Sequence, residues 1–533
     1  MTYSKTFLGD LPELTYEIIK YFKNDFSTLH SCILVNRLWC RLAIPLLWEN
    51  PFSISTENYN FIEIYLHNLN DDLKSKLNEY RANDNLLPSN TLFYYPSFIK
   101  YLNTLKIITS VGKWVEDTIR TLKPENRYYL QNLDTISASN FKRLIYMSLL
   151  KMFIENETNL HTFDIEVYAF LNCKFYYNDI FELILRNPKF IHNVRNLKLY
   201  IGSSSGFSIH NNSSEYTLIK YHISQMINLH HNLKKIVLSY NSFPLYQSFL
   251  LSKDYNCSNT LNTIMLYQVN FKSIINLDKV FEQLNVLESV HIVYCSYLNT
   301  SFIQQIINIT KPFKLKSLFI NWRSQIDGSL QLLLQKSGDY LENFGYRLFE
   351  SSVKHQSFEL IIKYCKNIKF LDLSGIIDSQ ISHLMFNLIE NIKQNLNFLS
   401  ISAYRISNIS IESSSIILQN LGQILPSKLE YLNLILHIKI SDYEIFLKNS
   451  QNTFIKKLLI NNRMLEYSDD IAPYTKKYIM KEKRIKYLAI RDIKNKELFY
   501  LEDEVNEFKL YNIKVQRYID LFIGNYGFIR KLD

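Results

Sequence analysis

One apolar pattern recurs through most of this chain and constrains its fold more than any other feature. The pattern is an apolar residue, any two residues, an apolar residue, any one residue and an apolar residue, as in Leu315, Leu318 and Ile320. Its twelve copies begin at residues 160, 194, 233, 261, 287, 315, 341, 368, 396, 429, 455 and 485, and most intervals are 26 to 28 residues. A fixed period of this length is typical of a solenoid, in which each repeat buries its apolar edge only against its neighbours.

Each copy of the pattern predicts a short strand followed by a helix. Side chains alternate between the two faces of a strand, so the fourth and sixth positions of each copy face the core together. Helical periodicity fills the stretches between copies, for example at Ile381, Leu384 and Leu388, where Ser379 is expected to cap the helix. We therefore predict an α/β solenoid in which each repeat consists of a strand, a corner, a helix and a return.

The chain divides into three zones by pattern. Residues 1–52 form a small apolar helical block, residues 53–150 have an irregular helical pattern, and residues 151–533 hold the repeats. Two weaker copies begin at Leu102 and Leu130, so residues 100–150 can include degenerate first repeats. A Gly- and Ser-rich stretch at 202–214 predicts a flexible loop inserted between a strand and a helix.

Composition limits the classes of protein to consider. No apolar run is long enough for a membrane span, and the N-terminus lacks the apolar centre of a signal peptide, so we expect a cytoplasmic or nuclear protein without a membrane partner. The six cysteines are scattered without a Cys-x-x-Cys pair, which suits a reducing compartment and disfavours a zinc site. Neither a metal nor another cofactor is expected.

The repeats resemble leucine-rich repeats of the longer, helix-backed kind. The resemblance covers roughly residues 150–533 and implies an α/β solenoid with parallel strands on the concave face and helices on the convex face. Departures are visible in the turns, because the Asn or Cys that the family places after the strand appears clearly only at Asn241 and Cys295. Irregular turns are therefore expected.

The N-terminal block has its own helical signals. Pro12 can begin a helix in which Leu14, Ile18 and Phe22 form an apolar stripe. Asp25 or Ser27 can cap a second helix. That second helix is expected to include Leu29 and Ile33 and to reach Leu38 and Trp39 near its end, while Trp48 and Phe52 are expected to pack on the helices that follow.

This block resembles the F-box over about 40 residues. The resemblance rests on the Leu11-Pro12-Glu13 opening, the Tyr21-Phe22 end of the first helix and the Leu34-Val35-Asn36-Arg37-x-Trp39 signature. It implies docking on a Skp-type linker that bridges to a cullin–RING ubiquitin ligase. The linker contacts that it implies are Leu11, Pro12, Leu14, Ile18, Val35 and Trp39.

The concave face of the repeats is the expected binding surface. If the fourth and sixth positions face the core, the fifth and seventh face outward, and aromatic and Arg side chains there commonly anchor protein interfaces. The candidates for contact with a protein substrate are Tyr200, Tyr267, His291, Phe319, Asn321, Arg347, Asp372 and Arg491.

Together these observations favour an adaptor without catalytic residues of its own. No nucleophile elbow, Walker loop or dinucleotide fingerprint is present. The repeats would recognise a protein substrate and the F-box-like block would recruit a ubiquitin ligase for protein catabolism. The alternative is a scaffold or receptor that uses the repeats without any ligase. Nucleic-acid binding through the basic residues at 476–486 is disfavoured, because Glu502, Asp503, Glu504 and Glu507 follow closely.

Overall fold

The computed structural model gives the positions of most of the chain. It describes residues 11–528 apart from 24, 55–58, 80–90, 122–134, 157–158, 169–173, 203–213, 240–242, 244–246, 248–249, 252–255, 327, 349–353, 404–408, 465–470, 481–483 and 525–527. The second weak repeat at Leu130 and most of the predicted loop at 202–214 lie outside the described residues.

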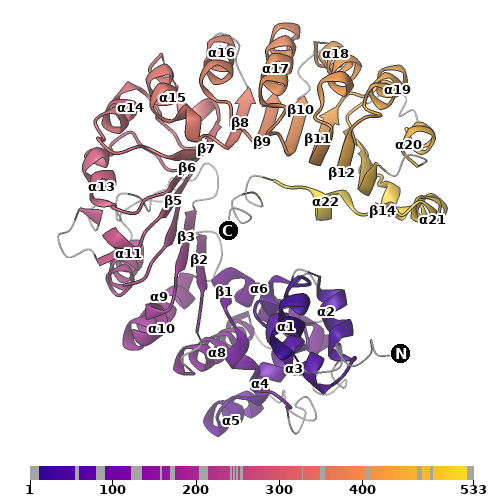
Figure 1. The fold of residues 1–533 in the computed structure, drawn as a ribbon. Helices are drawn as coiled ribbons and strands as arrows, with labels where there is room; N and C mark the ends of the chain where they lie inside the picture. Colours follow the sequence, from indigo (N-terminus) through magenta and orange to yellow (C-terminus); the bar gives the residue numbers. More distant parts are fainter. Residues whose placement is uncertain are drawn as a thin grey trace. The chain divides into compact units, whose positions relative to one another are not determined.

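From residue 101 onward, strands alternate with one or two helices along most of the described part of the chain (Figure 1). The strands are β1 (Tyr101–Asn103), β2 (Thr162–Tyr168), β3 (Asn196–Gly202), β4 (Lys235–Ser239), β5 (Thr263–Tyr267), β6 (Ser289–Val293), β7 (Leu315–Ile320), β8 (Asn343–Leu348), β9 (Phe370–Gly375), β10 (Phe398–Ala403), β11 (Lys428–Leu436), β12 (Phe454–Asn462), β13 (Ile485–Asp492) and β14 (Lys514–Val515). The α-helices of the N-terminal half are α1 (Pro12–Lys20), α2 (Phe26–Ile33), α3 (Arg37–Leu47), α4 (Phe61–His67), α5 (Asp71–Glu79), α6 (Thr104–Thr121), α8 (Thr135–Glu155), α9 (Lys174–Arg186), α10 (Lys189–His192) and α11 (Ser214–Asn228). Those of the C-terminal half are α13 (Leu277–Gln283), α14 (Thr300–Ile307), α15 (Leu330–Ser337), α16 (Lys354–Tyr364), α17 (Ser379–Ile392), α18 (Ile409–Ile424), α19 (Ile440–Asn449), α20 (Ala472–Ile479), α21 (Glu502–Leu510) and α22 (Tyr518–Leu521).

The chain forms two compact units. Unit 1 contains residues 1–264 and 283–286, and unit 2 contains residues 265–282 and 287–533. In unit 1 the strands β1, β2, β3 and β4 are hydrogen-bonded in sequence order, and in unit 2 the strands from β6 to β14 are also in sequence order. Adjacent strands in both units pair in parallel, for example β2 with β3 and β9 with β10. An α/β fold of repeating parallel strands and helices is thus confirmed.

The strands lie where the apolar pattern places them. Each of the strands β2 to β13 contains the fourth to sixth positions of one of the twelve copies. The weak copy at Leu102 also contains a strand, β1, which pairs with β2. By contrast, β14 was not predicted, although Leu510, Ile513 and Val515 form one more copy of the pattern 25 residues after the twelfth.

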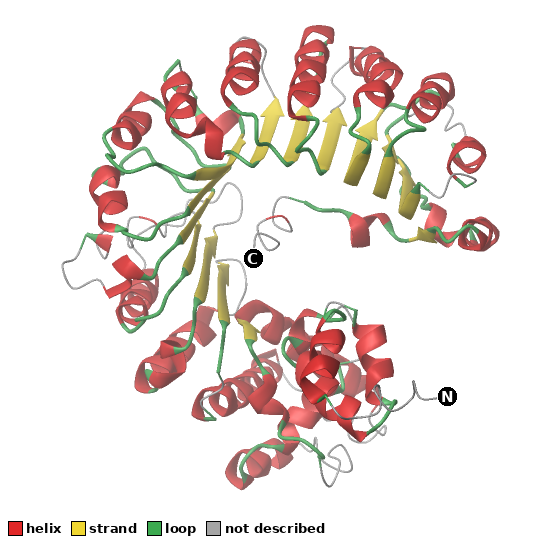
Figure 2. Cartoon of the chain, viewed as in Figure 1, coloured by secondary structure: helices red, strands yellow, loops and turns green. Residues whose placement is uncertain are grey.

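The core of unit 2 lies between its strands and its helices. Leu318, Leu371 and Leu399 occupy the fourth position of their repeats and are buried, and the helices lie on one side of these strands (Figure 2). Burying one such side chain contributes about 1.5–3 kcal/mol. The repeats therefore stabilise one another through a continuous apolar layer.

The helix of the repeat that contains β9 differs in detail from the prediction. Helix α17 begins at Ser379, but its N-cap is Asp378, whose carboxylate accepts a hydrogen bond from the Ile381 amide at 2.8 Å. An aspartate can accept this bond as readily as a serine, so the cap lies one residue earlier than expected. The buried stripe includes Ile381, Met385 and Leu388, whereas Leu384 is only half-buried.

Buried side chains tie the turns after β6 and β7 to their neighbours. The Cys295 thiol donates to the carbonyl oxygen of Leu266 at 3.3 Å. One repeat later, the Ser324 hydroxyl donates to the carbonyl oxygen of Cys295 at 2.8 Å. A polar side chain thus satisfies a backbone group of the preceding repeat, although the second of these residues is a serine rather than an asparagine or cysteine.

Three helices form the N-terminal block. Helix α1 begins at Pro12 as predicted, and Asp25 caps α2 by accepting a hydrogen bond from the Thr28 amide at 3.1 Å. The prediction that α2 continues to Trp39 was wrong. It ends at Ile33, and α3 begins at Arg37 because the Asn36 side chain caps it.

Candidate binding surfaces

The N-terminal block has a closed core and several exposed apolar residues. Its core joins Ile19, Leu29, Cys32, Ala43 and Leu46. Leu11, Leu14 and Val35 are instead 50–57% exposed, and the neighbouring Leu34 is 76% exposed. These residues contribute little to the core, and their apolar side chains are accessible to a partner.

The six predicted linker contacts differ in their environments. Leu11, Pro12, Leu14 and Val35 are exposed, whereas Ile18 and Trp39 are half-buried. Trp39 also packs against the core of the block. A substitution at Trp39 therefore tests the stability of the block as well as docking.

The block is fixed to the elements that follow it in unit 1. The carboxylate of Glu49, which is 4% exposed, forms ion pairs with Lys23 at 2.6 Å and Lys100 at 2.7 Å. The carbonyl oxygen of Glu49 accepts hydrogen bonds from the amides of Lys100 and Tyr101, at the start of β1. A buried carboxylate with two cationic partners holds the end of the block against the first strand.

Aromatic packing adds to this attachment. The Trp48 ring lies 4.2 Å from the Tyr95 ring and 5.3 Å from the Tyr65 ring, measured between centroids. Phe52 packs edge-on against Phe153 of α8. The prediction that Trp48 and Phe52 pack on the following helices is confirmed.

In unit 2 a second surface lies on the side of the strands that the helices leave uncovered. We call it the strand face and define it by the third, fifth and seventh positions of the repeats in β6 to β13. The strand register aligns these positions in rows. The fifth positions Phe319, Gly345, Asp372, Ser400 and Asn433 lie next to one another on successive strands.

The third positions contribute an aromatic row that was not among the predicted contacts. Phe370 of β9, Phe398 of β10 and Tyr431 of β11 are aligned, and their ring centroids are 5.9 and 6.0 Å apart. The prediction named only the fifth and seventh positions. The alternation of side chains along a strand could have found the third, because it lies two residues before the fifth.

Phe319 is the most enclosed of the predicted contacts in unit 2. Its side chain is 1% exposed and lies against Gly345 on the next strand, where a Cβ atom would stand 2.2 Å from the ring. Its ring centroid is 5.8 Å from that of Phe370. Gly345 thus lets the Phe319 ring lie flat on the sheet and reach the aromatic row.

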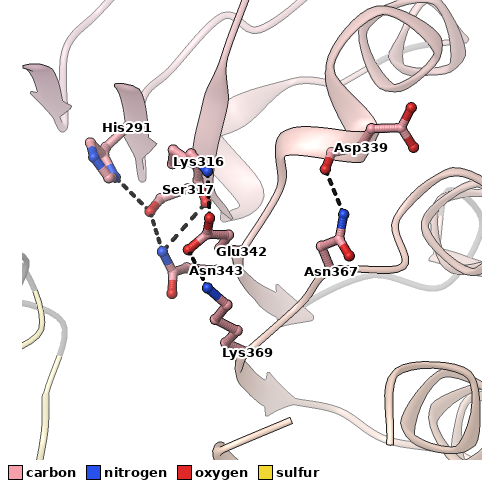
Figure 3. A network of polar contacts seen from close by, with 8 residues as sticks. All are labelled: His291, Lys316, Ser317, Asp339, Glu342, Asn343, Asn367 and Lys369. Atoms are coloured by element: carbon pink, nitrogen blue, oxygen red, sulfur yellow. Dashed lines mark hydrogen bonds and ion pairs between the residues drawn. The ribbon is translucent and has the colours of Figure 1, made fainter. Parts of the chain in front are cut away.

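His291 lies at the start of a polar network (Figure 3). Its Nδ1 is 2.7 Å from the Ser317 hydroxyl, which also accepts a hydrogen bond from the Asn343 amide at 2.9 Å. A register shift in β6 pairs His291 with Ser317, so it belongs with the third positions and not with Phe319 as the spacing suggests.

Glu342 occupies the other part of this network. Its carboxylate accepts from the ammonium groups of Lys316 and Lys369 on the two neighbouring repeats. Although burial raises the pKa of Glu342, the two lysines lower it below its ordinary value. Nearby, the Asn367 side chain donates to the carbonyl oxygen of Asp339 at 2.8 Å. These contacts join successive repeats near the N-terminal ends of their strands (Figure 3).

Arg347 and Asp372 lie close to each other on the strand face. The Arg347 guanidinium is 4.6 Å from the centroid of the Tyr294 ring. Burial raises the pKa of Asp372 above its ordinary value, while a hydrogen bond with Ser400 and the charge of Arg347 oppose the rise. Asn321 stabilises a neighbouring turn: its side chain accepts a hydrogen bond from the backbone amide of Arg323 and caps a short 3₁₀ turn.

The remaining predicted contacts lie apart from this group. Arg491 of β13 belongs to the seventh positions and pairs in register with Asn461. Tyr267 is half-buried at the end of β5, and Tyr200 of β3 is 1% exposed and belongs to unit 1. The structure thus brings Phe319, Arg347 and Asp372 together.

The C-terminal segment covers part of the strand face. Tyr518 and Leu521 join Tyr431, Leu459 and Ala489 in one buried cluster. Phe528 packs on the Phe370 ring with centroids 4.3 Å apart. In Figure 1 the ribbon of α22 lies on the side of the strands opposite α18 and α19. This coverage could not be inferred from the repeat pattern, which describes each repeat only by its own residues.

Within the described residues, no group of three or more His, Cys, Asp or Glu side chains could hold a metal ion. Burial raises the pKa of Cys295 and of Cys365 to about 12, which keeps both thiols protonated at neutral pH. His230 bonds the Met226 carbonyl oxygen through Nδ1. Cys173 lies outside the described residues.

The basic residues of 476–486 are largely paired in the described part of this segment. Lys476 forms ion pairs with Glu504 and Glu507, and Lys477 pairs with Glu444. Arg484 is buried and donates to the carbonyl oxygens of Ser450 and Tyr478. Lys476, Lys477 and Arg484 thus form contacts within the chain.

Comparison with known proteins gives no relative from which a function could be transferred. No protein-family model matches the sequence, and no curated protein matches it. In the described part of the chain, no helix is long and apolar enough to cross a membrane.

Proposed function

We propose that this protein is the substrate-recognition adaptor of a Skp–cullin–F-box-type ubiquitin ligase. In this proposal the N-terminal block docks on a Skp-type linker, and the strand face of the leucine-rich repeats binds a protein substrate. The chain supplies proximity between the substrate and a ubiquitin-charged enzyme and takes no chemical step itself. Its place of action is the cytoplasm or the nucleus.

The observation that carries the proposal is the exposure of apolar residues at F-box-like positions. Leu11, Leu14 and Val35 stay exposed although the block has a complete core of other residues. Exposing such side chains to water is unfavourable unless a partner covers them. The attachment of the block through Glu49 further supports the proposal, because it would hold a docked linker against the first strand of unit 1.

Docking is tested by co-purification of the chain with a Skp-type linker. The variants Leu14→Asp and Val35→Asp place a charge at exposed positions outside the core of the block. We expect each to lower the recovered linker at least tenfold while the Tm stays within a few degrees of wild type. Ile275→Asp is the matched control, because Ile275 is 67% exposed and lies in unit 2. Unchanged linker recovery in both block variants would sink the docking proposal.

A ligase-independent scaffold is the second candidate. It is favoured by the contacts of the block with β1, which also suit a block that closes the end of the repeats. In that case residues 11–52 would be required for stability but not for any linker. Deleting them would then lower the Tm strongly, and the intact chain would recover no linker.

A further inference from the structure

The C-terminal segment lies on the strand face in the manner of a bound peptide. Leaving β14, the chain turns over the strands, and its residues 518–524 and 528 are described. Its contacts there are made mainly by side chains. The Tyr518 hydroxyl donates to the Asn433 Oδ1 at 2.6 Å, and the Ile523 amide donates to the Tyr431 hydroxyl at 3.2 Å.

Two aromatic side chains anchor the segment. The Tyr518 ring lies beneath the Arg491 guanidinium, 4.5 Å from its centroid, while its hydroxyl reaches Asn433. Phe528 enters between two rings of the strand face, with centroids 5.0 Å from Phe319 and 4.3 Å from Phe370. Both anchors are buried. Aromatic side chains buried in this way dominate the affinity of many protein interfaces.

The surface beneath the segment has a specific chemical character. It combines the aromatic row with one amide oxygen that accepts the tyrosine hydroxyl and one guanidinium above the tyrosine ring. Burial raises the pKa of Tyr518, so its hydroxyl stays a donor at neutral pH. Such a surface selects a peptide with a tyrosine followed by a second aromatic residue.

We propose that the strand face of unit 2 is a binding site for an extended protein segment with two aromatic anchors, and that the chain's own C-terminal segment occupies this site as a competing internal ligand. The proposal rests on the proposed function, since it specifies the substrate that the repeats recognise. A substrate segment displaces Tyr518 and Phe528 and places its own tyrosine on Asn433 and its second aromatic ring between Phe319 and Phe370. Only chains whose site is empty can bind the substrate segment. The apparent affinity for the substrate therefore falls as the C-terminal segment occupies the site in a larger fraction of the chains.

The test uses the full chain and a fluorescent peptide with the sequence of residues 514–533. Binding is measured by fluorescence anisotropy. We expect the double variant Tyr518→Ala/Phe528→Ala, which empties both anchor positions, to bind the peptide at least tenfold more tightly than wild type. Adding Asn433→Ala to the double variant should remove most of that gain. The matched control is Phe499→Ala/Tyr500→Ala, a pair that is 39% and 65% exposed outside the strand face and should leave binding at the wild-type level.

Folding of the variants is checked by thermal unfolding. If the double variant no longer unfolds cooperatively, Tyr518→Phe decides, because it removes only the hydroxyl and should still raise peptide affinity about threefold. No gain in affinity for a folded variant would mean that the segment is a permanent part of the fold and would overturn the proposal. Equal binding of a scrambled peptide would overturn it as well. Linker recovery is measured separately. A failed peptide-binding test of the strand face can therefore be told apart from a failure of the N-terminal block to dock on the linker.

Discussion

The buried histidine His230 gives this protein a predictable response to acid. The His230 side chain is 1% exposed and bonds the Met226 carbonyl oxygen through Nδ1 at 2.9 Å. Burial lowers its pKa to about 4, against the favourable bond to Met226, and the nearby His192 and His231 add to the decrease. The folded state therefore holds this imidazole neutral over a pH range in which the unfolded chain binds a proton.

The sign of the effect follows from proton linkage. Between the ordinary pKa of 6.5 and the folded pKa of about 4, the unfolded chain binds more protons at this histidine than the folded chain. The contribution of neutral His230 to the free energy of unfolding is therefore fully present above pH 6.5 and is lost as the pH falls toward 4. A shift of this size corresponds to roughly 3 kcal/mol. We expect His230→Leu to lose much less stability than wild type between pH 7.5 and 4.5, measured by urea unfolding.

The neighbouring His231 provides the control for this prediction. It is exposed, so His231→Leu should keep the wild-type loss of stability in acid. An acid sensitivity of His230→Leu equal to that of wild type would contradict the assignment to His230.

At the scale of one element, helix α3 depends on its cap. The Asn36 side chain accepts a hydrogen bond from the Trp39 amide at 2.9 Å, and it separates α3 from the end of α2 at Ile33. Replacing such a cap by alanine costs about 1 kcal/mol. We expect Asn36→Ala to speed hydrogen exchange of the first-turn amides of α3 about fivefold, whereas Asn36→Asp should restore protection.

Asn50 offers a matched asparagine for this measurement. It precedes the short 3₁₀ turn Pro51–Ser53 without a capping bond from its side chain, so Asn50→Ala should leave exchange in α3 unchanged. Equal exchange rates in Asn36→Ala and wild type would show that packing alone holds the first turn of α3.

The break between helices at Asn36 shows which helix boundaries neighbouring residues predict and which they do not. The Pro12 start and the Asp25 cap could be predicted, because each depends on a residue and its immediate neighbours. The break between α2 and α3 was missed, because Leu34, Val35 and Leu38 continue an apolar pattern across it. An asparagine can cap a helix or face water within one, so the residue type at Asn36 does not decide whether a helix breaks there.

At the scale of the whole molecule, a core substitution in one repeat should destabilise mainly that repeat and the two next to it. Leu399 of β10 is fully buried and aligned with Leu371 and Leu432 on the two adjacent strands. Replacing a buried leucine by alanine costs about 2–5 kcal/mol. Because each repeat contacts mainly its neighbours, we expect Leu399→Ala to raise hydrogen exchange in β9, β10 and β11 much more than in β6 and β7.

Ser402 is the control on the same strand, since it faces away from this core layer at the seventh position. Ser402→Ala should change exchange little. A uniform rise through all strands of unit 2 in Leu399→Ala would show that the repeats unfold as one cooperative block.

The sequence by itself determined the strands β2 to β13 and the core positions of each repeat. These follow from local alternation and a fixed period, which need no knowledge of distant residues. Only the tertiary structure decided what lies on the strand face. Asn433 and Tyr518 are 85 residues apart, and Tyr431 and Ile523 are 92 apart, so no local pattern links them. Alternation states that a side chain leaves the core, but whether water, a partner or the chain's own end then covers it depends on contacts between distant segments.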